Sequence, residues 1–159
     1  MAKKVNKVKT RAASPPQPRG KAPRFASPEA SIADDAVAAM LSSYDAKTRA
    51  VVKAIHKDVA AIKGVDVGVK WNSVSFRVGD TWFGTVNVRA KEGILLVLHT
   101  GAERKSDIKG QVGEMKGAAE LKWLGVERAV VGVESASVWK RKWKVLRGVV
   151  SEWVMNVQP

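Results

Sequence analysis

The segment from Val67 to His99 constrains the fold of this 159-residue chain more than any other. Apolar and polar residues alternate from residue 73 to residue 78, which is the period of a half-buried strand. Gly79-Asp80 and Lys91-Glu92-Gly93 are typical of tight turns. The run from Ile94 to Leu98 is apolar throughout, as in a strand covered on both faces. Three adjacent strands on such short connections predict an antiparallel meander.

The side-chain parity of these strands predicts which residues point inward. In the middle strand, Trp82 and Val86 should share the inner face, with Phe83 and Thr85 on the outer face. In the preceding extended segment, Trp71 has the parity of two inward valines and should also point into the core.

The flanking segments predict helices that would cover this sheet. Asp45 can cap a helix over 46–62, and a serine at 135 or 137 can cap a second helix after a last strand over 127–133. The second helix carries an apolar stripe at spacings of three and four: Trp139, Trp143, Leu146, Val150 and Trp153. Residues 101–120 read as a loop with a short helix within 107–120. The fold class expected is α+β, an antiparallel meander sheet of four to five strands with N-terminal and C-terminal helices packed on one face.

The basic charge of the chain is concentrated at its start. Residues 1–28 hold eight of the 28 Lys and Arg residues, five prolines and no acid. Such a segment buries too little apolar surface to offset the entropy lost on ordering, so we expect 1–28 to be a disordered basic tail. Residues 29–159 should form a single domain.

Composition excludes several classes of site. The chain has no cysteine, which rules out disulfides, thiolate metal sites, cysteine-ligated iron–sulfur clusters and cysteine nucleophiles. No GxSxG, HExxH or phosphate-loop motif occurs. We therefore expect no enzymatic activity, although a Ser75–His99 pairing stays open. No apolar run is long enough to span a membrane, and the first thirty residues lack the apolar core of a signal peptide, so the expected location is cytoplasmic.

Four polar residues around the predicted sheet are the candidate ligand-binding site. His99 ends the third meander strand and can titrate near neutral pH. Lys70 and Asn72 lie at the entrance to the first strand, and Arg128 lies in the last strand, expected over 127–133. Asn72 has a plain alternative as a turn residue, and Lys70 has one as a solvated charge. Together they would suit an anion better than a metal ion, because none supplies a negative charge.

Part of the sequence resembles a known family. The segments that carry the likeness are Val-Lys-Trp-Asn (69–72), Ser75-Phe76, the run ending Leu96-Val97-Leu98-His99, and Leu121-Lys122-Trp123-Leu124. They resemble the YdhG-like domain family, over roughly residues 30–157. The resemblance implies a frataxin-like outline, and one branch of the family is described as an iron chaperone, which makes iron the implied cofactor. The first helical region departs from an acidic iron-binding ridge, since Lys47, Arg49, Lys53, Lys57 and Lys63 interleave its acids.

Two functions follow from these patterns. The first is a small binding or chaperone-like domain that holds a small anionic ligand, or iron as the resemblance implies, in a pocket on the sheet. The alternative is a nucleic-acid-associated protein that binds through the tail, with sequence-independent and salt-sensitive contacts. The tail residues proposed for that role are Lys3, Lys4, Lys7, Lys9 and Arg11.

Overall fold

The protein is an α+β sandwich of one antiparallel sheet and two long helices, in a computed structural model that describes residues 34–101 and 107–158. The sheet has six strands in the order β1-β2-β3-β4-β6-β5, and every neighbouring pair is antiparallel. The predicted fold class is confirmed, with one strand more than the four to five expected. The strands are β1 (Val65–Lys70), β2 (Ser73–Val78), β3 (Thr81–Ala90), β4 (Gly93–His99), β5 (Lys122–Gly125) and β6 (Arg128–Gly132).

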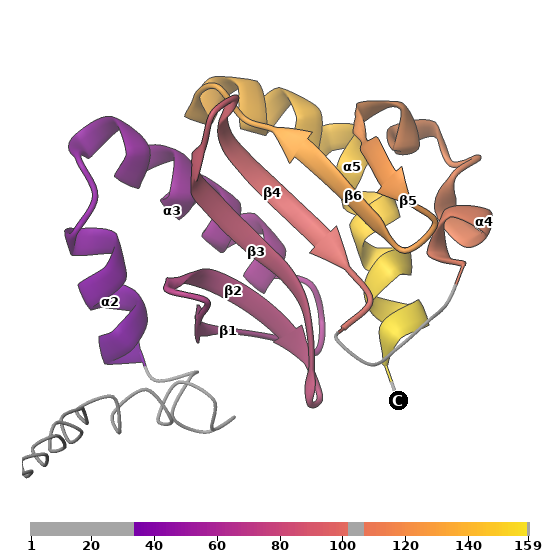
Figure 1. The fold of residues 1–159 in the computed structure, drawn as a ribbon, viewed down its shortest axis with the longest axis horizontal. Helices are drawn as coiled ribbons and strands as arrows, with labels where there is room; N and C mark the ends of the chain where they lie inside the picture. The colour runs from indigo at the N-terminus through magenta and orange to yellow at the C-terminus, as the bar shows by residue number, and fades with distance from the viewer. Residues whose placement is uncertain (1–33, 102–106, 159) are drawn as a thin grey trace, which may run out of the picture.

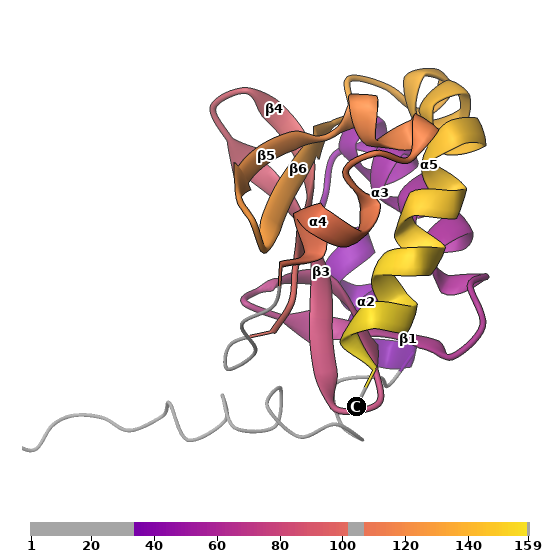
Figure 2. The same cartoon turned by 90° about the vertical axis from the view of Figure 1, so that its right-hand side faces the viewer.

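Two helices cover the inner face of the sheet, α3 (Ala46–Ala60) and α5 (Ala136–Val157) (Figures 1 and 2). Asp45 caps α3 by accepting from the Thr48 amide, and Ser135 caps α5 by accepting from the Val138 amide, so both predicted caps are confirmed. A shorter helix, α2 (Asp34–Ser42), contacts β1, β2 and α3. Among the described residues, no helix lies over the opposite face of β3, β4 and β6 (Figure 2).

The core lies between the inner face and the two long helices. Trp139 and Trp153 of α5 are fully buried in it together with Phe76 and Phe83. Each indole also donates a hydrogen bond to another element. Trp139 Nε1 donates to Asp58 Oδ2 of α3 at 2.8 Å, and Trp153 Nε1 donates to the His99 carbonyl of β4 at 2.9 Å. Trp143, from the same predicted stripe, is only partly buried and stacks on Trp139 with ring centroids 5.1 Å apart.

A β-bulge makes the predicted parity of the middle strand wrong. The β2–β3 register shifts between Phe76 and Arg77, so Trp82 pairs with Arg77 on the outer face and Phe83 enters the core. The guanidinium of Arg77 lies 5.9 Å from the Trp82 ring centroid. An extra residue in one strand exchanges the two faces, which simple alternation cannot anticipate.

The segment after β4 contains two short helices and the strand that was not predicted. α4 (Ile108–Val112) and a 3₁₀ helix, η3 (Lys116–Glu120), fall within the region expected to hold a short helix. β5 then pairs with β6 at the edge of the sheet, where Leu124 is exposed. The boundary expected at residue 28 and the tail itself lie outside the described residues.

Candidate functional site

A hollow of about 610 Å³ opens on the outer face of the sheet. Part of its lining follows from strand alternation, because four of the lining residues share the outer face in the strand register: Ser73, Thr85, Val97 and Arg128. The remaining lining residues are Trp71, Asn87, Arg89, His99 and Gly101. Four different strands and two connections therefore contribute to one site.

The β1–β2 hairpin turn supplies the aromatic wall of the hollow. Lys70 pairs with Ser73, so Trp71 and Asn72 form a two-residue turn, with φ of 55° and 57°. Positive φ at both central residues is the type I′ geometry that suits the twist of paired strands. The expectation that Trp71 points into the core is wrong, because strand parity stops at the turn and the side chain is 54% exposed.

The Trp71 ring packs edge-on against His99. The two ring centroids are 5.5 Å apart and the planes are inclined by 75°. Lys70 Nζ lies 5.1 Å from the Trp71 ring centroid and 5.6 Å from that of Trp82, which places the ammonium between two indoles. The turn thus brings an aromatic ring and a cation to the end of β4.

The surroundings of His99 keep its imidazole neutral. Burial, together with the charges of Arg128 and Lys70, lowers the pKa of His99 to about 4, with burial the largest cause. Nδ1 accepts the Gly101 N–H at 3.3 Å, so the proton of the neutral ring sits on Nε2. His99 can therefore donate one hydrogen bond from Nε2 without carrying charge.

Two arginines give the hollow its charge. Arg128 is directly opposite His99 in the β4–β6 register, and Arg89 donates from Nη2 to Ser73 Oγ at 3.4 Å. Both side chains are exposed, and no carboxylate is among the residues that line the hollow in the described part of the chain. This combination of guanidinium groups and neutral donors suits a ligand that carries negative charge.

The four predicted site residues are brought together only in part. His99 and Arg128 line the hollow. Lys70 does not line it, but its ammonium lies over the Trp71 ring and its charge helps to lower the pKa of His99. Asn72 is a turn residue and is not part of the lining. The Ser75 hydroxyl bonds to the Lys70 and Ser73 carbonyls and to Thr85 Oγ1, so its hydrogen bonds do not pair it with His99.

Sequence reasoning missed Trp71 and Arg89 as site residues. Arg89 has the outer-face parity of Thr85 and Asn87, so that signal was present in the sequence. Trp71 could have been found by treating Trp-Asn as the centre of a hairpin turn rather than as the end of a strand.

Within the described ranges, no three His, Asp or Glu side chains are grouped so that they could hold a metal ion. No helix formed by these residues is long and apolar enough to cross a membrane. The proposed nucleic-acid residues of the tail lie outside the described part of the chain. Comparison with protein-family models, curated proteins and solved structures finds no match to this chain.

Proposed function

We propose that this protein is a small binding domain that holds an organic anion in the hollow on the outer face of its sheet. The observation that carries the proposal is the lining itself, in which Arg89 and Arg128 lie beside neutral His99 and none of the described lining residues is a carboxylate. A ligand with a carboxylate or phosphate group would supply the missing charge.

The geometry suggests how such a ligand would be held. A guanidinium presents two parallel N–H donors to a carboxylate or phosphate, which makes Arg128 the natural anchor for the charged group. His99 Nε2–H would donate a further hydrogen bond. Trp71 and Val97, which line the same hollow, would cover an apolar or planar part of the ligand.

The resemblance to the YdhG-like family would instead suggest iron as the ligand. Iron of the kind carried by chaperones binds to clustered carboxylate oxygens or to several imidazoles. The hollow offers one imidazole and two arginines, so its chemistry favours the anion over the metal ion.

Proton–nitrogen NMR of the full chain tests the proposal. Inorganic phosphate, short-chain carboxylates and aromatic carboxylates should each be titrated, with ferrous iron as a separate series. At least one anion should shift His99 and the Trp71 indole, and its bound charge should raise the pKa of His99. Arg128→Gln should weaken that binding by about tenfold or more, since a hydrogen bond to a charged group is lost.

Arg141→Gln is the matched control, because Arg141 is an exposed arginine of α5 that does not line the hollow. It should leave the affinity of the anion unchanged. The proposal is wrong if every anion leaves His99 unmoved while iron shifts it.

A second candidate function is binding of nucleic acid through the basic tail. It is favoured by the eight basic residues and the absence of acids in residues 1–28. Such an arm would neutralise phosphates and release counterions without reading the sequence of bases. The two functions use different parts of the chain and can be separated by removing the tail.

A further inference from the structure

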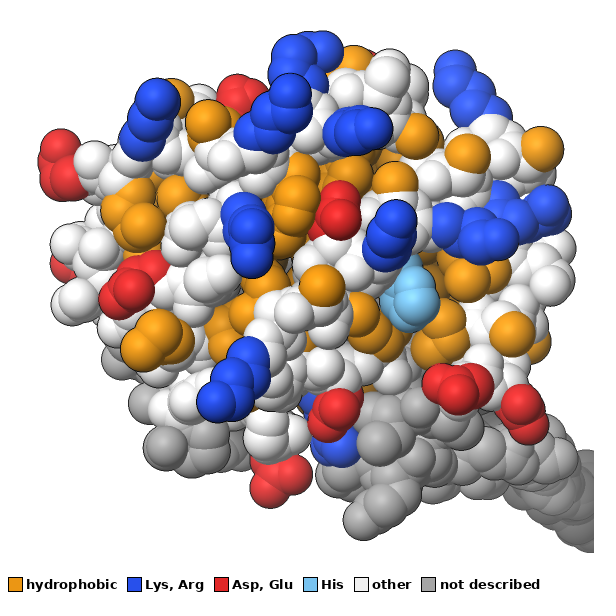
Figure 3. Space-filling model, turned by 180° about the vertical axis from the view of Figure 1, so that it is seen from behind, with side chains coloured by type: hydrophobic (Ala, Val, Ile, Leu, Met, Phe, Trp, Pro, Cys, Tyr) orange, Lys and Arg blue, Asp and Glu red, His pale blue; other side chains and the backbone are white. Residues whose placement is uncertain are grey.

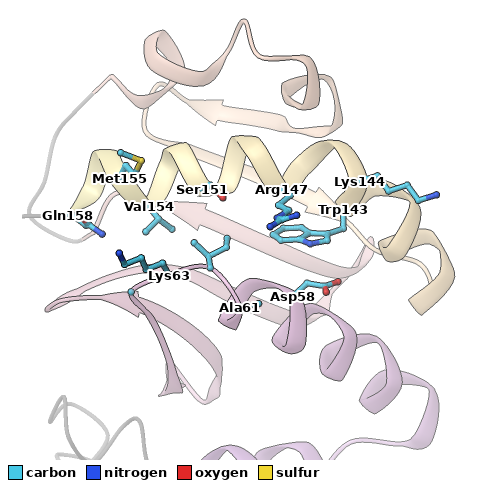
Figure 4. Close-up of a pocket in the computed structure, with 12 residues that line it drawn as sticks. Asp58, Ala61, Lys63, Trp143, Lys144, Arg147, Ser151, Val154, Met155 and Gln158 are labelled. Atoms are coloured by element: carbon cyan, nitrogen blue, oxygen red, sulfur yellow. The ribbon is translucent and has the colours of Figure 1, made fainter.

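A second hollow lies on the helical side of the molecule, between the end of α3 with the residues that follow it and the part of α5 from Trp143 onward. It has a volume of about 1040 Å³. Its lining includes Ile62, Lys63, Trp143, Lys144, Arg147 and Met155 (Figure 4). We refer to it as the α3–α5 groove. It shares no lining residue with the hollow on the outer face of the sheet.

The floor of the α3–α5 groove is apolar. Ile62 and Val154 contribute from the two helical regions, and Trp143 contributes an indole that is stacked on Trp139 at 25° between planes. Met155 is 67% exposed, the highest value among the large hydrophobic side chains that stand out of the described surface. An exposed methionine can adapt its shape to different apolar side chains, and methionine is common on peptide-binding surfaces.

The rim of the groove is basic. Lys63, Lys144 and Arg147 are all exposed, and within the described residues none of them makes a salt bridge. Figure 3, which views the helical side, shows Lys and Arg side chains distributed around apolar surface. The one carboxylate in the lining, Asp58, already accepts the hydrogen bond from Trp139 Nε1. The net charge around the apolar floor is therefore positive.

We propose that the α3–α5 groove docks an acidic peptide segment of a partner protein, with a large apolar side chain of that segment seated on the floor. Its Asp and Glu residues would meet the basic rim, and its apolar side chain would cover Trp143 and Met155. This is the arrangement of a peptide anchored by apolar residues and oriented by complementary charge. The proposal is independent of the anion on the outer face.

The positive charge of the rim favours an acidic peptide over the other molecules that could occupy the groove. Residues 1–28 of the same chain are uniformly basic, and a second copy carries a net charge of +13, so both would be repelled by the rim. A nucleic acid would match the charge of the rim but not the apolar floor. An acidic segment with an apolar anchor satisfies both parts of the groove.

Selection from a random-peptide display library against the full chain tests this proposal without assuming a partner. The enriched peptides should combine Asp and Glu with Leu, Phe or Trp. A fluorescein-labelled copy of one of them should then be measured by anisotropy. Lys144→Gln with Arg147→Gln should weaken binding by about tenfold, and Met155→Ser should weaken it at unchanged charge.

The matched control is Lys140→Gln with Arg141→Gln, which removes the same charge from exposed positions of α5 outside the groove. This variant should bind the peptide with the affinity of the native chain. Arg128→Gln should also leave the peptide affinity unchanged, which would show that the two sites are separate. The basic tail is present in every variant, so its contribution cancels.

Three outcomes would overturn the proposal. The library could yield no acidic peptides with apolar anchors. The control variant could lose as much affinity as the groove variant, which would indicate general attraction to a basic surface. A single-stranded oligonucleotide could shift the groove residues in NMR spectra and displace the peptide, which would make the groove a nucleic-acid surface.

Discussion

Trp71 shows how a single residue can defeat prediction from sequence. The nearby residues Val67 and Val69 are correctly predicted on the inner face of β1. The hollow depends on the turn that begins two residues after Val69. A left-handed backbone at two consecutive non-glycine residues costs free energy, about 1–2 kcal/mol for a residue such as Trp. No glycine at either position marks this left-handed turn in the sequence. The contact of Trp71 with His99 and Lys70 shows where the turn places the ring.

The first prediction concerns His99 and the pH dependence of folding. The pKa of His99 is about 4 in the folded protein and about 6.5 in the unfolded chain. Between these two pH values, the unfolded chain binds a proton at His99 that the folded chain does not bind. Stability should therefore fall as the pH drops from about 6.5 to about 4, with no further loss from this group below that. Between pH 7 and pH 5 the loss should reach up to about 2 kcal/mol.

Urea unfolding of the native chain and of His99→Gln at these two pH values measures this contribution. His56, whose pKa is also lowered by burial, is present in both proteins and cancels in the comparison. Equal loss of stability in the two proteins would show that His99 titrates normally in the folded state.

At the scale of elements, the hairpins were predictable and the edge of the sheet was not. Turn residues such as Gly79-Asp80 fix a connection locally, so β2, β3 and β4 follow from short stretches of sequence. β5 has four residues, Lys122 to Gly125, which is too short to show a period of two. The Lys109 amide of α4 donates to the Val126 carbonyl in the β5–β6 turn, a long-range contact that sequence periodicity does not report.

The second prediction concerns the close contact between η3 and α5. A β-carbon added at Gly117 would lie 2.0 Å from the Val145 carbonyl oxygen, which belongs to the helix backbone and cannot rotate away. Gly117→Ala should therefore separate η3 from α5 and cost more than about 2 kcal/mol of stability. Thermal or urea unfolding would measure it.

Gly125→Ala in β5 is the matched control, because no atom lies within 4 Å of the position its β-carbon would take. We expect that variant to stay within about 0.5 kcal/mol of the native protein. If the two alanine variants unfold together, the packing of η3 on α5 is not as described.

At the scale of the whole molecule, charge is distributed unevenly along the chain. The first 28 residues carry only basic charge, whereas the rest of the chain mixes basic residues with all 15 acids. The overall fold could be predicted because the strand and helix patterns lie in 45–157. The shape of the outer hollow could not, because it needs residues from four strands and a bulge to be in register at once.

The third prediction separates the tail from the domain. Removal of residues 1–28 should leave the thermal midpoint unchanged, since the segment has no apolar periodicity. It should flatten the salt dependence of any duplex DNA binding, whose log affinity falls by about 0.9 per phosphate contact for each unit of log salt. Heparin chromatography and DNA titrations at several salt concentrations would measure this. Sequence-selective binding that survives the truncation would contradict a tail-based mechanism.

The position of α5 in chain order has a consequence for how the protein is made. This helix contributes seven buried residues and follows all six strands in the sequence. It contacts α3, α4 and η3, and its indoles bond to Asp58 and to the end of β4. Synthesis runs from the N-terminus, so the part of the inner face that α5 covers stays exposed on the ribosome until residues 136–157 emerge, although α3 is made before the strands. We therefore expect the growing chain to expose the apolar side chains that pack against α5 until this helix has been made.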